Sequence, residues 1–139
     1  MFAAMGKTEF TPAIGRLIEF AEENEMTVDE VRRDWVTIDT FRYQLAAFFN
    51  RYDALITPVY TDVAFPHGES MENPDRYGFI FPFSLSGSPA VVVPAGIDIA
   101  TGLPVGVQIV GPHWHENQLL ELARHIERQL GGWQRARLQ

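Results

Sequence analysis

Cysteine is missing from this chain of 139 residues, lysine occurs only at Lys7, and no hydrophobic run is long. Without cysteine there is no disulfide framework, no thiolate nucleophile and no cysteine-ligated metal. The longest apolar run, Pro89 to Ile97, falls far short of the roughly 20 residues that a transmembrane helix needs. The first residues reach Lys7 and Glu9 before a signal-peptide core forms. We therefore expect a cytoplasmic protein.

Positive charge is also scarce. The 11 basic side chains are outnumbered by 18 acidic ones, which gives a formal net charge of −7 at pH 7. Nucleic acids and anionic membrane surfaces both attract clustered Lys and Arg, so we predict no nucleic-acid partner and no membrane partner. What the chain does have is an ordinary globular composition, 46% hydrophobic with ten phenylalanines, which is enough for one domain with a core.

Three stretches have the apolar periodicity of helices. The first starts at Thr11 and Pro12, because threonine suits an N-cap and proline suits the first helical position. The second starts at a capping box, Thr27–Glu30, and is expected to end near Asn50. Its apolar stripe consists of Val31, Trp35, Ile38, Leu45, Phe49 and Tyr52.

The third predicted helix lies near the C-terminus, with Asn117 as its expected N-cap and Gly131-Gly132 as its stop.

Three short apolar segments are predicted strands: DALITPV (53–59), PAVVVPAG (89–96) and PVGVQIVG (104–111). The last two could pair antiparallel, and their continuous apolarity predicts a sheet covered on both faces. The region from Tyr60 to Pro82 lacks a period and is predicted to be a functional or surface-wrapping loop. These elements indicate an α/β fold forming a single unit over residues 1–139.

The segment GLPVGVQIVG, residues 102–111, raises the question of a phosphate-binding loop. Such a loop needs a strand, a turn of the form GxGxxG or GxxxxGK[ST], and a helix whose first amides point at the anion. Here the glycines stand four and five residues apart, with β-branched residues between them. We therefore expect a strand whose glycines permit close backbone approach, and no nucleotide or other cofactor.

Serines and histidines offer two further constellations. A Ser–His–Asp hydrolase places its serine in a Gly-x-Ser-x-Gly elbow before a helix, whereas Ser86–Ser88 precedes a predicted strand. His113 and His115 stand two apart, which is a metal pattern, but zinc needs a third ligand and the H-E-x-x-H spacing fails at Leu119. We predict surface or loop histidines and no metal site.

Four segments occur in a telling order: DALITPV, FSLSGSPAVVVPAG, GLPVGVQIVG and ENQLLELARHIE. Together they resemble the C-terminal part of the amidase signature family. There the segments read D-x-L-x-x-P, N-x-x-G-x-P-A-x-x-x-P, G-L-P-x-G-x-Q-x-x-G and a leucine-rich helix. The resemblance covers residues 50–132, and the ordered set is specific although each motif alone is weak. It implies a fragment of a mixed sheet, with two or three short strands and about three covering helices.

The resemblance also implies an activity, hydrolysis of a carboxamide C–N bond by a Ser–cis-Ser–Lys triad. One serine attacks the carbonyl, the second serine and the lysine shuttle protons, and backbone amides hold the oxyanion. No two serines of this chain are adjacent, and no GGSSGG-like segment occurs. We therefore assign no catalytic residue and predict that the chain alone is inactive.

One departure from the family pattern concerns substrate binding. Where the family has asparagine in N-x-x-G-x-P, this chain has Ser84. In family members this loop approaches the acyl-binding channel, so the resemblance implies that Phe81, Ser84 and Ser86 contact substrate. The alternative is a structural turn ahead of a strand, because Ser, Gly and Pro are ordinary turn residues.

Two functions follow. The first is the C-terminal segment of an amidase-type hydrolase, which supplies sheet strands and part of the substrate channel without the nucleophile. It would bind a small amide only together with an N-terminal amidase part. The second is a noncatalytic module that binds a small amide or assembles with itself. In either case the few strands leave apolar surface uncovered, so we expect a homo-oligomer or a complementary N-terminal amidase fragment as partner.

Overall fold

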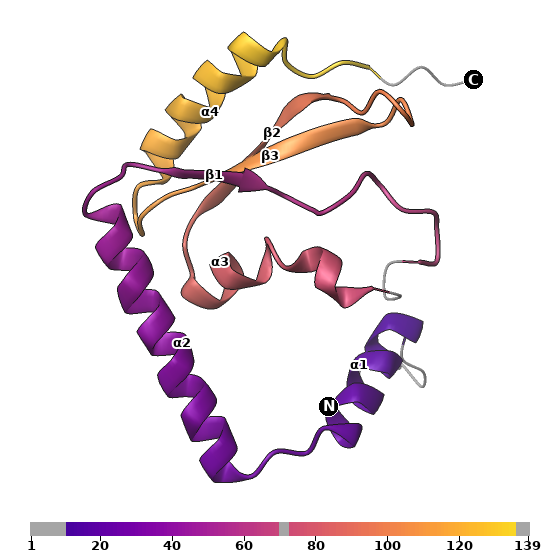
Figure 1. Ribbon diagram of the computed structural model, residues 1–139, viewed down its shortest axis with the longest axis vertical. Helices are drawn as coiled ribbons and strands as arrows, with labels where there is room; N and C mark the ends of the chain where they lie inside the picture. Colours follow the sequence, from indigo (N-terminus) through magenta and orange to yellow (C-terminus); the bar gives the residue numbers. More distant parts are fainter. Residues whose placement is uncertain (1–10, 70–72, 136–139) are drawn as a thin grey trace, which may run out of the picture. The chain divides into compact units, whose positions relative to one another are not determined.

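The computed structural model describes residues 11–69 and 73–135 (Figure 1). The chain divides into two compact units, Met1–Val36 and Thr37–Gln139. The described residues form four α-helices, one 3-10 helix and three strands, which confirms the α/β class. One of these helices, α3 (Phe81–Ser86), comes in addition to the three that the sequence predicted. The prediction of a single family unit over residues 1–139 is not tested by this division and stays a prediction.

The first unit contains helix α1 (Pro12–Glu23), which starts where the sequence placed it. Thr11 is the N-cap and has an extended backbone, although its side chain makes no capping hydrogen bond. The helix ends at Asn24, whose backbone N–H and side-chain Nδ2 both donate to Phe20 O, at 3.1 and 2.7 Å. Thus proline and asparagine set the two ends of α1.

Helix α2 (Val28–Phe49) starts at the predicted capping box and ends next to Asn50, as predicted. Thr27 N donates to Glu30 Oε2 at 2.8 Å, and Glu30 N donates to Thr27 Oγ1 at 3.3 Å. The hydrogen bond from the Thr27 hydroxyl, followed by the one from its backbone N–H, holds the pKa of Glu30 below its ordinary value. None of the residues of α2 is buried, despite its apolar stripe.

The second unit contains a three-stranded sheet in the order β1 (Leu55–Pro58), β3 (Pro104–Val110), β2 (Ala90–Ile97). Both pairings are antiparallel, so β2 and β3 pair as predicted. The expected mixed sheet is represented here by antiparallel pairs alone. A bulge between Pro94 and Gly96 shifts the register of β2 at its proline, where a ladder hydrogen bond is missing in any case.

Helix α4 (Glu116–Leu130) covers one face of the sheet (Figure 1). The core between this helix and the sheet consists of Val93 and Ile109 from the strands and Leu119 and Ala123 from α4. The N-cap is His115 rather than the predicted Asn117, because Asn117 already has helical backbone within the first turn. The helix stops at Gly131 with φ +91°, as predicted, since glycine adopts the left-handed conformation without steric cost.

The other face of the sheet is only partly covered. Figure 1 places α3 on the side opposite α4, and Val110 is fully buried there. Gln108 is also buried, and its Nε2 donates to Pro58 O at 3.0 Å and to Phe79 O. By contrast, Val92 on the same face is 54% exposed. The prediction of a sheet covered on both faces is therefore wrong for the described residues, because a helix of six residues is too short to span it.

Two glycines of the segment 102–111 lie in tightly packed surroundings, as predicted. A Cβ added at Gly106 would lie 3.1 Å from Val92 Cγ1 and 3.2 Å from Val93 O. At Gly111 it would lie 2.8 Å from Leu119 Cδ2, in the core. Gly102 is different, because its surroundings are open and its φ of +72° is what requires glycine.

Candidate functional site

The segment before β2 contains more regular structure than predicted. The 3-10 helix η2 (Pro74–Tyr77) and α3 interrupt the expected loop, and α3 replaces the expected serine turn. Helix α3 has proline in its first turn, and Gly87 follows it with φ +72°. Proline near the start of a helix and glycine just past its end are sequence signals of helix boundaries, so this short helix could have been found.

The three predicted substrate-contacting residues lie in different surroundings. Phe81 is exposed at the start of α3, and its ring centroid lies 6.0 Å from that of Tyr77. Ser84 is exposed on the same helix. Ser86, at the end of α3, is only 4% exposed. The structure therefore places Ser86 in the interior and leaves Phe81 and Ser84 at the surface.

Phe81 ends a row of aromatic rings, which we call the aromatic row: Phe65, Tyr60, Tyr77 and Phe81. The ring centroids of Tyr60 and Phe65 are 5.7 Å apart, and those of Tyr60 and Tyr77 are 5.2 Å apart. These spacings are typical of favourable aromatic pairs. The row joins the segment after β1 to the start of α3, and the sequence contained no period that would have revealed it.

Ser86 is fully engaged by its neighbours. Its Oγ lies 3.1 Å from Phe83 O and 2.9 Å from Ser88 Oγ, and it accepts the backbone N–H of Ser88 at 3.3 Å. Because a hydroxyl has one proton, Ser86 donates to Phe83 O and Ser88 donates to Ser86. A serine used in this way holds its own turn together, and no base among the described residues lies on its hydroxyl to make it a nucleophile.

Two distant side chains hold the end of α3. The Nε and Nη2 atoms of Arg42 donate to Leu85 O at 3.0 and 2.8 Å, while Nη1 donates to Asp39 Oδ1 at 3.1 Å. His113 Nε2 lies 3.0 Å from Ser86 O, and since a carbonyl only accepts, this nitrogen carries the proton. These donors satisfy carbonyls that the end of a helix leaves open. No sequence signal linked Arg42 to a segment 43 residues away.

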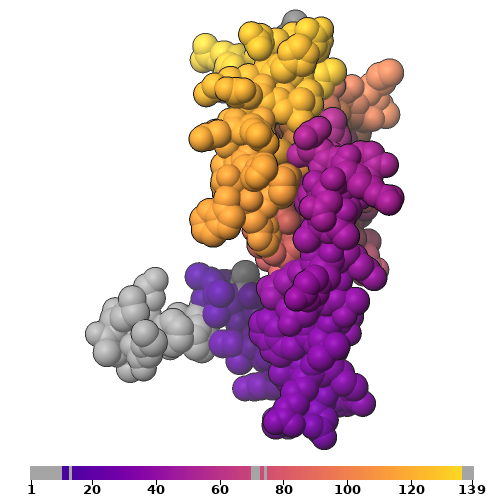
Figure 2. All heavy atoms as spheres, turned by 90° about the vertical axis from the view of Figure 1, so that its left-hand side faces the viewer, coloured from indigo at the N-terminus to yellow at the C-terminus, as the bar shows by residue number. Residues whose placement is uncertain are grey.

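A cavity of about 320 Å³ lies beside this anchored end, and we call it the α2–α4 cavity. Figure 2 faces the side of the molecule where the C-terminal end of α2 and the start of α4 lie next to each other. Ser86 is the only predicted site residue that lines this cavity. Its complete lining is Arg42, Leu45, Ala46, Phe49, Asn50, Ser86, Ser88, Pro112, His113 and His115.

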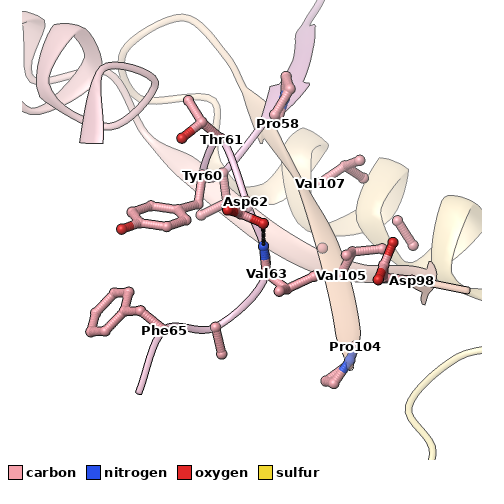
Figure 3. Close-up of a pocket in the computed structure, with 14 residues that line it drawn as sticks. Pro58, Tyr60, Thr61, Asp62, Val63, Phe65, Asp98, Pro104, Val105 and Val107 are labelled. Atoms are coloured by element: carbon pink, nitrogen blue, oxygen red, sulfur yellow. Dashed lines mark hydrogen bonds between the residues drawn. The ribbon is translucent and has the colours of Figure 1, made fainter. Parts of the chain in front are cut away.

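A second hollow of about 550 Å³ lies along β3 (Figure 3). The segment 58–65 forms one side of it, and the rings of Tyr60 and Phe65 project away from β3. Its two carboxylates bond to their own turns: Asp62 accepts the N–H of Val63, and Asp98 accepts the hydroxyl and N–H of Thr101, which lowers the pKa of Asp98. Neither carboxylate faces a serine, lysine or histidine of the described lining, so this hollow holds no catalytic set.

The histidines near α4 form no metal site with their described neighbours. Residues 11–69 and 73–135 contain no group of three or more His, Asp or Glu side chains that could hold a metal ion. His115 instead donates from Nδ1 to Gln118 Oε1 at 2.9 Å, beside the exposed Trp114. Within the same two ranges no helix has the length and apolarity that crossing a membrane requires.

A comparison with known protein families supports the resemblance that the four ordered segments indicated. The sequence model of the family described as Amidase matches residues 1–120. The chain belongs to the Amidase family. The resemblance that the four ordered segments indicated is therefore confirmed.

Relatives and solved structures of the Amidase family agree. A glutamyl-tRNA(Gln) amidotransferase component from Halothermothrix orenii is 39% identical over 59% of this chain and 18% of the relative. A crystal structure of an amidase matches with a TM-score of 0.73 and 26% identity, over 88% of this chain and 29% of that one. The corresponding amidotransferase component from Thermotoga maritima matches with a TM-score of 0.55 and 27% identity, over 78% and 29%. The chain thus spans less than a third of each of these proteins.

Proposed function

We propose that this Amidase-family chain is the C-terminal segment of an amidase-type hydrolase. It would contribute the three strands and part of the substrate channel, while an N-terminal amidase part supplies the nucleophile. One observation carries the proposal: a solved amidase matches 88% of this chain, whereas this chain matches only 29% of that amidase. The cytoplasmic location expected from the sequence stays a prediction.

The hydrogen bonds of Ser86, Ser88 and His113 support the proposal that the catalytic groups come from an N-terminal amidase part. Hydrolysis of an amide needs an activated nucleophile and donors for the oxyanion. Ser86 and Ser88 bond to each other, and His113 donates to the backbone carbonyl of Ser86 rather than accepting from a hydroxyl. No base among these described residues is therefore placed on either serine, so the proposal assigns the nucleophile and its base to the N-terminal amidase part.

We propose that substrate lies against the aromatic row and the exposed start of α3. Phe81 and Ser84 are both accessible there, and aromatic rings offer large apolar contacts to an acyl or aryl group. Ser86 would contribute from the interior, because its hydrogen bonds to Phe83 O and from Ser88 N–H hold the end of helix α3, which carries Ser84. The substrate class is a small carboxamide.

A complementation assay tests this proposal. The chain is purified alone and together with an N-terminal amidase part that carries the triad, and release of a chromophore from an aryl amide is followed. We expect no rate above buffer for the chain alone and a clear rate for the pair. A rate of the chain alone that disappears in Ser84→Ala, Ser86→Ala or Ser88→Ala would overturn the proposal, because it would place a nucleophile here.

The alternative is a noncatalytic module that binds a small amide or assembles with itself. The exposed apolar side chains of α2 favour it equally, since self-association would cover them as well. Relatives whose names describe components of an amidotransferase support assembly with other chains without identifying the partner. A chain that restores no activity with any N-terminal part but binds amides saturably would favour this alternative.

A further inference from the structure

We propose that the α2–α4 cavity binds a small organic carboxylate with an apolar body, such as an arylcarboxylate. This site is separate from the aromatic row, because no residue of the row lines the cavity. It is a binding site without catalytic residues. The proposal rests on the charge, the open donors and the apolar wall of the cavity.

Charge is distributed unevenly around this cavity. The whole chain has 18 acidic and 11 basic side chains, yet the described residues that line the cavity include one arginine and two histidines and no acidic residue. The carboxylate of Asp39 reaches Arg42 at Nη1, but Asp39 does not line the cavity. In a protein of net charge −7, a cavity without carboxylates in its lining favours an anion over a cation.

Arg42 retains hydrogen-bonding capacity after anchoring α3. A guanidinium has five N–H donors, and three of them serve Leu85 O and Asp39 Oδ1. One N–H on each terminal nitrogen is left for a ligand. Asn50, which follows the last residue of α2, adds a side-chain amide to the same lining. A carboxylate, which accepts through two oxygens, matches such donors.

The apolar part of the wall selects the body of the ligand. The apolar wall consists of three residues of α2, Leu45, Ala46 and Phe49, together with Pro112 from the connection between β3 and α4. A volume of about 320 Å³ is at the small end of ligand pockets, which suits a single ring or a short branched chain. Amide hydrolysis releases a carboxylic acid, so the natural ligand of this cavity could be a product of the proposed reaction. That identification rests on the proposed function, whereas the binding of a carboxylate does not.

Fluorine NMR of 4-fluorobenzoate with the full chain tests the proposal in any oligomeric state. The neutral isostere 4-fluorobenzamide, at the same ionic strength, is the comparison ligand. We expect saturable binding of the benzoate, at least about tenfold tighter than the benzamide, because a hydrogen bond to a charged acceptor is the stronger one. Equal affinities, or no saturation by the benzoate, would overturn the proposal.

Three variants locate the binding. Arg42→Gln removes the charge and should weaken benzoate binding about tenfold, but it also loosens the anchor on Leu85 O. Ala46→Phe fills the apolar wall, leaves the anchors of α3 intact, and should weaken binding by a similar factor. Arg51→Gln is the matched control, since Arg51 is an exposed arginine near the same helix end that does not line the cavity.

The outcomes separate this proposal from the proposed function. Unchanged affinity in Ala46→Phe, or equal losses in Arg51→Gln and Arg42→Gln, would place the anion elsewhere on the surface and overturn the cavity site. Binding needs no amidase activity and complementation needs no benzoate. A chain that binds benzoate but restores no hydrolysis would therefore contradict only the proposed function.

Discussion

Leu119 on α4 is 3% exposed, whereas Trp35 in the apolar stripe of α2 is 55% exposed, although both belong to helices with apolar positions at regular spacing. Helix α4 follows β3 after a short connection, so the sheet that it packs against is supplied by its nearest neighbours in the chain. Helix α2 has no buried residue among those described. The sheet and α4 thus bury each other's apolar side chains, using segments that are close in the sequence. The apolar stripe of α2 has no such neighbour, so another part of the protein or a second chain is needed to bury it.

The largest expected effect concerns that cover. Light scattering over a dilution series should give at least twice the mass of one chain at high concentration, and Trp35→Glu, in the exposed part of the apolar stripe, should shift the chain toward the monomer. The physical reason is that apolar patches of this kind usually find a partner. A compact monomer at every concentration, with a cooperative melt and no binding of a hydrophobic dye, would break the comparison.

Truncation of the core should be the most damaging single change to the fold. Leu119→Ala is expected to lower the free energy of unfolding by about 2–5 kcal/mol, because it leaves a cavity between α4 and the sheet. Chemical denaturation followed by circular dichroism measures it. Leu120→Ala, next to it on the exposed side, is the matched control and should cost about 0.5 kcal/mol or less. Equal losses would mean that α4 does not pack as described.

Adding bulk inside β3 should be the next most damaging change. Gly106→Val is expected to lower the free energy of unfolding by about 1–3 kcal/mol, because its side chain would press on Val92 and on the carbonyl of Val93. Gly102→Ala has open space and a positive φ, so only backbone strain of about 1 kcal/mol is expected. An undiminished melting temperature for Gly106→Val would show that this part of β3 separates easily from β2.

The smallest expected effect concerns the start of α2. The pKa of Glu30 is lower in the folded chain than in the unfolded chain, where it is about 4.3. Ionised Glu30 therefore stabilises the fold above a pH of about 4.3, and this stabilisation is lost as the pH falls through the lower pKa of the folded state. Carboxyl NMR titration should show this depressed pKa, with fraying of the first turn of α2 on acidification. Glu30→Gln keeps a side chain that can cap and should abolish this pH dependence. A Glu30 pKa at or above the ordinary value would contradict the capping box.

Prediction from the sequence succeeded where local signals are strong. The capping box at Thr27 and the glycine stop at Gly131 follow from backbone chemistry within a few residues, and the structure has both of them. Prediction failed on the question of whether another element lies over each face of the sheet. The continuous apolarity of β2 predicted two covered faces, yet Val92 is exposed, because periodicity reports which surface is apolar and not whether another element lies on it.

By itself the sequence determined the α/β class, the three strands, the three long helices and the Amidase family, since hydrophobic period, turn residues and ordered motifs are properties of the chain alone. Only the tertiary structure decided that Arg42 and His113 meet at the end of α3, that four aromatic rings form one row, and that a cavity whose described lining lacks carboxylates opens beside α2. These groups lie tens of residues apart, and their meeting depends on how the sheet orders its strands and where helices dock. No local pattern encodes that geometry.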